Sequence, residues 1–438
     1  MPFGWEVTPS GMEISVSPKR MLAGLSLCLD FVRKGLRRHH RRVASIALGI
    51  AGEMGLPPGE KDTVFLASLV HDVGVSTWQG KEALHQFEVE NPWEHCRAGF
   101  ELMSRVRLLE FLGAVILSHH DRYAGANDSG LSGEAIPLPA RIIHLADRVD
   151  VLLGYDRHVL VGVGEVTGRI RSLAGRHFDP AVVEAFLALA GRESFWLGLS
   201  DALCLNRSLD NACTVGEVGL DEADMRQMAR MFAQVIDKKS RFTRRHSQHV
   251  AAVAVTLAGA LGFSREDVVL MELAALTHDL GKLSVPEEIL EKPGPLTPEE
   301  YAVMRQHTFY TYVILNESGA PSPIPEWAAY HHERLDGNGY PFHLDAARLD
   351  TGARLMAVAD VFAALREDRP YRPGMNRRRV EEVMRRMAAE SALCGEIVGA
   401  LFDAYDAVER AMAAGEDLDD AEGRRVRDDG AKTAAAPG

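Results

Sequence analysis

The stretch THDLGK at residues 277–282 decides the fold of this 438-residue chain. It follows an apolar run from Leu270 to Leu276, which predicts a helix whose end carries His278 and Asp279 into the core. A buried imidazole beside a buried carboxylate is costly unless both are paired or bind a metal. One His-Asp pair by itself is weak evidence, so the interpretation depends on the other histidines and aspartates of the chain.

Further histidines and aspartates on separate apolar segments favour a metal site. Five histidines and two aspartates form the candidate ligand set: His246, His278, Asp279, His307, His331, His332 and Asp360. This is the inventory of a two-metal hydrolase site. Imidazole and carboxylate ligands suit Fe, Mn, Ni, Co or Zn more than Mg or Ca. We therefore expect two divalent metal ions as cofactors, with Fe and Mn preferred over Ni, Co and Zn.

Longer motifs make this part of the chain resemble a known family. The pair at 278–279 matches the one that names the HD phosphohydrolases, and HHERLDGNGYP at 331–341 matches the long motif of the HD-GYP cyclic di-GMP phosphodiesterases. The segments ILEKPGPLT at 289–297 and DRPYR at 368–372 agree with the same family. The resemblance covers roughly residues 237–408.

The resemblance implies a role for each candidate ligand. One metal would be held by four residues, His246, His278, Asp279 and Asp360. The other would be held by His307, His331 and His332, with Asp279 bridging and catalytic. Some family members bind a third metal through a glutamate four residues before the first histidine. Phe242 stands at that position here, which favours two metals.

Five residues are candidates for substrate binding. Lys282 lies about one helical turn after His278, where a cation can contact the scissile phosphate or position the attacking water, so we also expect it to be catalytic. Arg369 and Arg372 match family positions that hold substrate phosphates, a role that suits the bidentate guanidinium. Gly339 and Tyr340 belong to a tight loop in which glycine permits close approach and the ring can meet a base or sugar.

Equal spacings reveal a second copy of the ligand pattern nearer the N-terminus. His71 follows His39 by 32 positions, as His278 follows His246, and His119 follows His95 by 24, as His331 follows His307. The residues that match the later ligands are His39, His71, Asp72, His95, His119, His120 and Asp147. We therefore expect an all-α protein of two tandem HD-type helical bundle domains, the first with a possible metal site of its own.

The two copies differ at residues with a catalytic role. Val75 stands in the first copy where Lys282 stands in the second, and no Gly-Tyr-Pro sequence follows Asp121. The first copy is therefore expected to be regulatory or structural, to bind metal, and to turn over poorly. We choose His39 as its first ligand on spacing and expect His40 to be exposed on a basic turn.

The predicted domain limits follow from these motifs and from local composition. Residues 1–17 are an irregular lead-in, 18–200 a divergent HD domain, 201–218 a linker, 219–415 the HD-GYP domain, and 416–438 a disordered tail.

Net charge, apolar stretches and cysteine content limit the classes of partner and the cellular compartment that we expect. A net charge of −13 argues against a broad nucleic-acid or anionic-membrane surface, and no apolar stretch is long enough to span a bilayer. Five scattered cysteines and no signal pattern favour the cytoplasm. We expect a cyclic dinucleotide as ligand, no nucleic acid, no membrane, and signalling proteins or a second copy of the chain as further partners.

The function expected from the resemblance is metal-dependent hydrolysis of cyclic di-GMP to pGpG or GMP in bacterial second-messenger signalling. One alternative is a phosphohydrolase acting on another nucleotide, such as a different cyclic dinucleotide. Another is a cyclic di-GMP receptor without catalysis, which would bind the ligand and leave it unchanged. The complete ligand set and Lys282 favour an enzyme.

Overall fold

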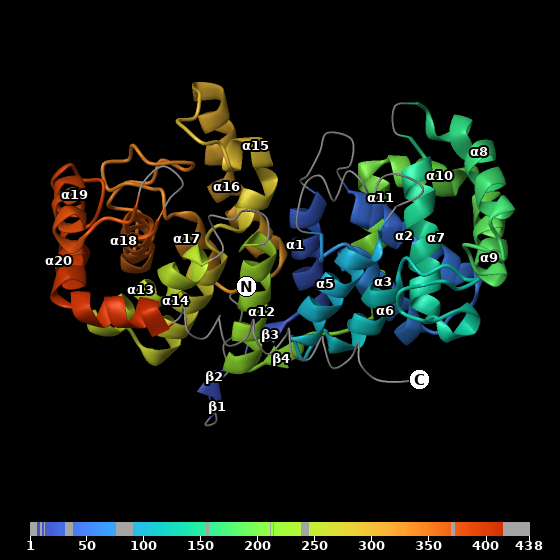
Figure 1. Cartoon of the computed structure of the whole chain (residues 1–438), viewed down its shortest axis with the longest axis horizontal. Coiled ribbons are helices and arrows are strands. Elements are labelled where there is room, and N and C mark those ends of the chain that lie inside the picture. The colour runs from blue at the N-terminus through green and yellow to red at the C-terminus, as the bar shows by residue number, and fades with distance from the viewer. Residues whose placement is uncertain are drawn as a thin grey trace. The chain divides into compact units, whose positions relative to one another are not determined.

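The computed structural model describes most of the chain (Figure 1). It leaves out residues 1–6, 9–10, 13, 31–37, 76–90, 155–156, 211, 213, 238–244, 369–372 and 415–438. Two compact units are present, Met1–Met231 with Ile314–Ala320, and Phe232–Val313 with Pro321–Gly438. Helices dominate both units, and the only strands among the described residues form two short antiparallel pairs. The all-α prediction is therefore confirmed.

Ten α-helices account for most of the residues that the structure describes in the first unit. They are α1 (Pro18–Asp30), α2 (His39–Glu53), α3 (Pro58–Val70), α5 (Trp93–Ser104), α6 (Gly113–Ser118), α7 (Leu138–Leu152), α8 (Val159–Ser172), α9 (Pro180–Ala190), α10 (Glu193–Ser200) and α11 (Ala202–Asp210). Short 3-10 turns, η1 (Glu110–Leu112) and η2 (Gly133–Ala135), flank α6. The core lies where α2 packs against α3, α7 and α9. Along α2 the apolar residues Val43, Ile46, Ala47 and Ile50 recur at helical spacing and are fully buried.

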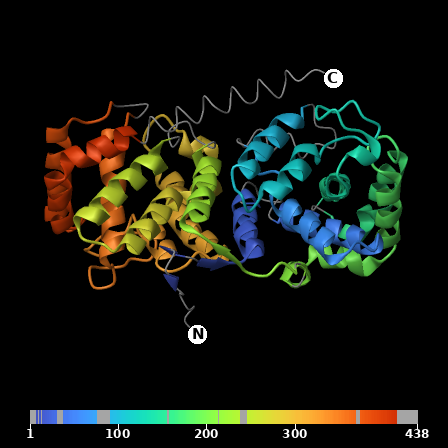
Figure 2. The same ribbon diagram turned by 90° about the horizontal axis from the view of Figure 1, so that it is seen from below.

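The second unit is also built from helices, drawn yellow to red in Figures 1 and 2. Its helices are α13 (His246–Ala260), α14 (Arg265–Thr277), α15 (Glu287–Leu290), α16 (Pro298–Glu317), α17 (Ile324–Ala329), α18 (Thr351–Arg366), α19 (Arg377–Ala389) and α20 (Gly395–Asp403), with a 3-10 turn η3 (Leu280–Ser284). Residues 405–414 are helical as well. Helix α13 packs against α14 and α18, as α2 packs against α3 and α7. The prediction of two tandem helical domains is confirmed.

The segments that we predicted as an irregular lead-in and as a linker contain regular structure. Strand β3 (Ile14–Val16), within the expected lead-in, pairs with β4 (Val218–Leu220), and β1 (Val7–Thr8) pairs with β2 (Gly11–Met12). Helix α11 occupies much of the expected linker and packs against α2, where Arg41 donates a hydrogen bond of 2.9 Å to Asn206.

The division between the units falls inside α12 (Glu222–Asp237), close to the predicted start of the second domain. Asp221 caps this helix by accepting a hydrogen bond of 2.8 Å from the backbone of Asp224, as its sequence indicates. The predicted tail at 416–438 lies outside the described residues. None of the described helices is long and apolar enough to cross a membrane.

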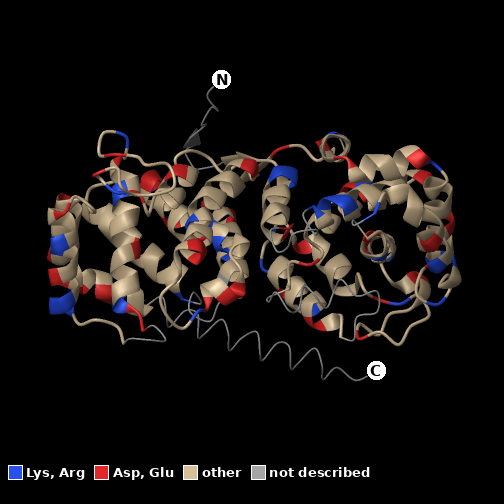
Figure 3. Cartoon of the chain, turned by 90° about the horizontal axis from the view of Figure 1, so that it is seen from above, with Lys and Arg blue, Asp and Glu red and all other residues tan. Residues whose placement is uncertain are grey.

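Acidic and basic residues are interspersed along the helices of each unit in the view of Figure 3.

Candidate metal centres

Five helical elements bring the candidate ligands of the second unit together. His246 begins α13, His278 follows the last residue of α14, and His307 lies on α16. His331 and His332 follow α17, and Asp360 lies on α18. In the first unit α2, α3, α5, α6 and α7 supply the matching residues in the same order. The common spacing therefore reflects a common helical frame.

A close backbone contact fixes the turn that carries His278 and Asp279. A Cβ atom placed on Gly281 would lie 1.8 Å from the carbonyl oxygen of His307 and 2.7 Å from the backbone nitrogen of Thr311. The Thr311 hydroxyl donates to the His278 carbonyl at 2.9 Å and accepts from the Gly281 N–H at 2.9 Å. Glycine at this position permits α16, with its ligand His307, to lie directly against the turn. Gly74 has the same role in the first unit, where its Cβ would meet the His95 carbonyl at 1.9 Å.

The first ligand group of the second unit consists of His246, His278 and Asp360. The Nε2 atom of His246 lies 3.0 Å from Asp360 Oδ1, and the Nε2 atom of His278 lies 3.8 Å from the same oxygen. Two atoms that each bind one ion at about 2.0–2.2 Å lie no more than about 4.4 Å apart. Nε2 of His278 is buried and has no hydrogen-bond partner among the described residues, which fits an atom that ligates a metal.

The second ligand group consists of His307, His331 and His332, whose ligand atoms all lie within 4.8 Å of one another. Asp279 stands between the groups. Its Oδ1 lies 3.7 Å from His307 Nε2 and 4.0 Å from His331 Nε2, whereas its Oδ2 lies 3.3 Å from His278 Nε2. One oxygen therefore faces each group, as a bridging carboxylate requires.

Hydrogen bonds at Nδ1 orient three of the imidazoles. His278, His307 and His331 each place Nδ1 at 2.7–2.8 Å from the carbonyl oxygen three residues earlier. Since a carbonyl only accepts, Nδ1 must carry the proton, and Nε2 keeps its lone pair for an ion.

A carboxylate orients the fourth imidazole. Glu367 lies 3.0 Å from His246 Nδ1 through one oxygen and 2.9 Å from His249 Nδ1 through the other. Sequence reasoning missed Glu367 and treated His249 as an ordinary residue. The signal available was the position of Glu367 directly before the DRPYR motif.

Burial and neighbouring charges set the ionisation of the site. Burial, together with the charge of His332, lowers the pKa of His307 to about 3, so its imidazole is neutral. Burial opposes ionisation of Asp279, but His278 and Lys282 hold the pKa of this carboxyl well below its usual range. Burial also opposes protonation of His246, yet hydrogen bonds to Asp360 and Glu367 raise its pKa to about 9. Neutral imidazole and ionised carboxylate are the forms that bind metals, so an ion must displace the proton of His246.

Lys282 lies inside the site. Its Nζ contacts Asp279 Oδ2 at 2.5 Å, and its side chain is 18% exposed. A lysine at a solvated helix end would not make this contact. The ammonium therefore stands beside the carboxylate oxygen that faces the first ligand group.

A buried glutamate holds the loop that contains Gly339 and Tyr340. Glu333 accepts hydrogen bonds from the backbone N–H groups of Phe342 and Leu344 at 2.7 and 2.9 Å. A Cβ on Gly339 would lie 2.4 Å from the Cα of Glu333, so glycine permits the loop to fold back on the histidine turn. From the sequence we expected Gly339 to let the backbone approach the ligand closely. In the structure it lets the loop approach the chain's own backbone at Glu333.

The ring of Tyr340 lies beside a candidate ligand. Its centroid is 5.0 Å from that of His332, and the guanidinium of Arg305 lies 5.0 Å over the same ring. Arg305 was missed by the sequence reasoning. Arg369 and Arg372, expected to hold substrate phosphates, lie outside the described residues.

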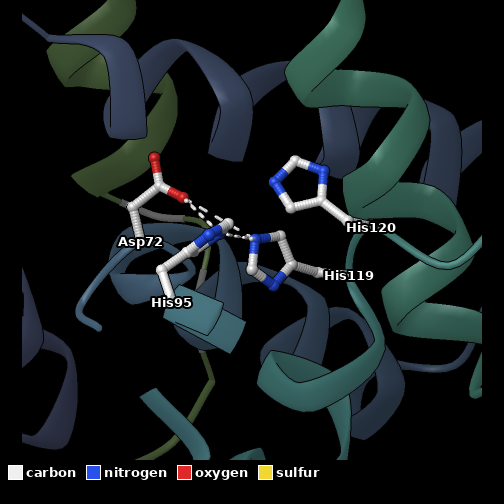
Figure 4. Close-up of side chains that lie close together, drawn as sticks. All are labelled: Asp72, His95, His119 and His120. Atoms are coloured by element: carbon white, nitrogen blue, oxygen red, sulfur yellow. Dashed lines mark hydrogen bonds and ion pairs between the residues drawn. The ribbon is translucent and has the colours of Figure 1, made fainter. Parts of the chain in front are cut away.

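The first unit brings its seven candidates into the same arrangement. Figure 4 shows Asp72, His95 and His119 pointing toward one another, with His120 alongside. Asp72 Oδ1 lies 3.5 Å from His95 Nε2 and 3.6 Å from His119 Nε2, while Oδ2 lies 3.5 Å from His71 Nε2. Asp72 thus repeats the two-sided position of Asp279.

The first candidate ligand of this unit is also oriented by a carboxylate. His39 Nε2 lies 3.5 Å from Asp147 Oδ1, and its Nδ1 contacts Asp150 Oδ2 at 2.8 Å. Asp150 is paired with Arg42 as well, through hydrogen bonds of 2.6 and 3.0 Å. Each unit therefore has a carboxylate behind its first histidine, shared with the residue three positions later.

The prediction that His40 is exposed on a basic turn was wrong. The side chain is buried, and its Nδ1 contacts Asp30 Oδ1 at 2.6 Å. Arg42 from the same basic run is buried too. Asp30 and Asp150 satisfy these buried side chains with hydrogen bonds, and neither is adjacent to them in the sequence.

Besides Val75 for Lys282, the two units differ in the residue that follows the last candidate ligand. Arg148 donates hydrogen bonds to Asp147 Oδ2 from Nε at 3.0 Å and from Nη2 at 2.5 Å, whereas Val361 follows the matching Asp360 in the second unit. Val75 is buried and apolar at the position of Lys282. The first unit therefore lacks the lysine of the second and neutralises one of its candidate ligands internally.

Comparison with known proteins agrees with the two-unit arrangement. Two different family models, each described as an HD domain, match residues 36–152 and residues 230–393. The 3'3'-cGAMP-specific phosphodiesterase 1 of Vibrio cholerae is 33% identical over 401 residues, 90% of this chain and 92% of that protein. A cyclic di-GMP phosphodiesterase of Thermotoga maritima is 39% identical over 151 residues, 34% of this chain and 40% of that protein. The crystal structure of a cyclic GMP-AMP specific phosphodiesterase of V. cholerae is 25% identical, with a TM-score of 0.65, and covers 90% of this chain and 98% of that chain.

Proposed function

Because this chain belongs to the HD-domain family of cyclic dinucleotide phosphodiesterases, we propose that its second unit is the catalytic one and hydrolyses cyclic di-GMP or 3'3'-cGAMP with two divalent metal ions. Lys282, which the first unit replaces by Val75, supports the choice of the second unit, and the position of Asp279 supports the pair of metal ions. One carboxylate oxygen faces His278 and the other faces His307 and His331, so the residue can bridge two ions.

The seven ligands of the second unit would hold the ions as two groups, with Fe or Mn preferred and Ni, Co or Zn also suited to these donors. When bound, the metal pair supplies a water of lowered pKa and neutralises charge on the phosphoryl oxygens. The hydrogen bonds at the Nδ1 atoms keep the imidazoles in the ligating tautomer.

Lys282 and the loop at 337–341 would position the substrate. The Lys282 ammonium beside Asp279 places a positive charge where a scissile phosphate would bind, and a charge aimed at the transition state lowers the barrier. The ring of Tyr340, next to His332, offers a face for a base or ribose, with Gly339 setting the fold of the loop. Arg369 and Arg372 remain our proposed phosphate contacts.

Two substrates have support from different observations. The HHERLDGNGYP motif favours cyclic di-GMP, and the products would be pGpG or GMP. A relative that aligns along 90% of this chain is named for 3'3'-cGAMP, which favours that nucleotide for a protein with both units. The test is incubation of the purified full chain with each nucleotide under Mn(II) or Fe(II), followed by chromatography of the products.

We expect linear products from at least one of the two nucleotides, and none from an Asp279→Ala variant. Binding of either nucleotide without product would support the receptor alternative and refute the enzyme assignment. Normal turnover by Asp279→Ala would refute the assignment of the site.

The first unit, with Val75 in place of the lysine, would be regulatory or structural, and we keep 18–200 and 219–415 as the proposed domain limits. We also propose a cytoplasmic protein that works with signalling partners or as a homodimer.

A further inference from the structure

Asp30 holds the imidazole of His40 in a fixed orientation inside the first unit. Nδ1 of His40 lies 2.6 Å from Asp30 Oδ1, and the same oxygen accepts from the backbone N–H of His40 at 3.2 Å. Both side chains are less than a tenth exposed. An ionised carboxylate only accepts, so Nδ1 carries the proton and Nε2 keeps its lone pair. This is the same carboxylate–histidine arrangement that His246 makes with Glu367.

The free lone pair of His40 is directed at the candidate metal ligands. Its Nε2 lies 4.0 Å from Asp72 Oδ2, and its ring centroid lies 5.0 Å from that of His71. The ligand atoms of His40, His71 and Asp72 all lie within 4.8 Å of one another.

Neither the Nε2 of His40 nor that of His71 has a hydrogen-bond partner among the described residues, although both atoms are fully buried. A buried polar atom without a partner costs on the order of 1–3 kcal/mol. Two such atoms facing one carboxylate oxygen therefore indicate an ion between them.

The second unit has no imidazole at the position that matches His40. Ser247 follows His246 at the position of His40, and a serine side chain does not reach as far as an imidazole. Its hydroxyl is buried and likewise lacks a partner among the described residues. The extra donor is therefore a property of the first unit.

We propose that His40 is an eighth metal ligand of the first unit, where it binds a divalent transition metal together with His71 and Asp72, and that Asp30 positions it. This inference rests on the proposed function in one respect, that the His-Asp clusters bind metal.

An additional imidazole beside Asp72 Oδ2 would fill one coordination position of an ion held there, whereas in the second unit the matching oxygen of Asp279 contacts the Lys282 ammonium instead. Catalytic metal sites keep such a position for water or substrate, whereas structural sites close it. The closed position agrees with the loss of the lysine at Val75 and with the pairing of Asp147 by Arg148. The first unit is then a metal-holding unit whose ion stabilises the fold.

The test measures metal binding by the full chain. Wild type, His40→Ala and the matched control Ser247→Ala are loaded with Mn(II), desalted, analysed for bound metal, and titrated with a chelator. We expect His40→Ala to lose about one metal equivalent or to release it at an at least tenfold lower chelator concentration, and Ser247→Ala to match wild type. Equal content and equal chelator resistance in His40→Ala and wild type would overturn the proposal.

A milder variant covers the case in which His40→Ala does not fold. Asp30→Asn leaves the imidazole in place but weakens its orientation, and loss of such a partner typically lowers metal affinity 10–100-fold. Wild-type affinity in a folded Asp30→Asn variant would count against the positioning role.

Product formation separates this inference from the proposed function. Turnover by wild type with metal content independent of His40 would refute only the inference. Metal content that depends on His40, without turnover by wild type, would refute only the proposed function.

Discussion

Substituting Glu367 by glutamine tests whether the carboxylate behind His246 sets metal affinity in the second unit. Glu367 accepts from His246 Nδ1 at 3.0 Å and from His249 Nδ1 at 2.9 Å, one through each oxygen. Glutamine keeps the size of the side chain but has one accepting oxygen and no charge. His246 then loses its 3.0 Å contact with the second carboxylate oxygen and keeps at best the longer one of 3.2 Å to the oxygen that also faces His249, and the basicity that the carboxylate confers on His246 is lost.

Replacing such a partner typically weakens metal binding 10–100-fold, which corresponds to about 1.4–2.8 kcal/mol. We expect Glu367→Gln to release Mn(II) at a correspondingly lower concentration of a competing chelator. Its hydrolysis rate should fall at limiting metal and recover at excess metal, because no group that contacts the substrate has changed.

The matched control is Glu409→Gln. Glu409 pairs with Arg366, the residue before Glu367, at 2.7 Å and contacts no candidate ligand. It should retain wild-type metal affinity. Unchanged affinity in Glu367→Gln would show that the contact does not orient His246. A rate that excess metal fails to restore would show that Glu367 acts on the chemistry itself.

Three further perturbations follow from the site. Lys282→Ala should lower the hydrolysis rate about 100- to 1000-fold and leave the metal content unchanged, since the ammonium is not a metal ligand. An unaltered hydrolysis rate would mean that Lys282 has only a structural role. Gly281→Ala should lower the free energy of unfolding, measured by thermal unfolding, by about 1–3 kcal/mol, because the added Cβ would lie 1.8 Å from the His307 carbonyl oxygen. A variant as stable as wild type would contradict that geometry. The chelated protein should lose stability between about pH 7 and pH 9.5. His39 and His246 have folded pKa values of about 9 against 6.5, so their contribution is complete below 6.5 and is lost as the pH rises through 9. Unfolding temperatures that stay level across this range would refute those pKa values.

The features that the sequence predicted share one property: they repeat at fixed spacing along helices. His39 to His71 and His246 to His278 have equal offsets because each pair joins the start of one helix to the end of the next. The periodicity of the apolar residues sets where those helices begin and end. The ligand clusters and the all-helical class could therefore be inferred without knowledge of the packing.

The features that it missed depend on contacts between distant residues. Asp150 lies 111 positions from His39, and Glu367 lies 121 positions from His246, so neither pairing leaves a local pattern. The pairing of β3 with β4 joins strands of three residues about 200 positions apart, too short to show alternation. His40 was misassigned for a different reason: its charged neighbours indicated solvent, and its partner Asp30, only ten positions earlier, was not recognised.

The close backbone contacts at Gly74 and Gly281 have a consequence for how proteins of this kind are classified. Each glycine is required by the carbonyl of the helix opposite, which no side-chain change elsewhere can move out of the way. Divergence after duplication could therefore replace the lysine by Val75 while the glycine had to stay. A search pattern of histidine, aspartate, any residue and glycine therefore reports shared architecture, whichever residue stands at the lysine position. If the unit with Val75 is regulatory or structural, as proposed, the residue that follows glycine is the more informative one, and counting both units of such tandem proteins as enzymes on the shorter pattern would overstate their hydrolytic capacity.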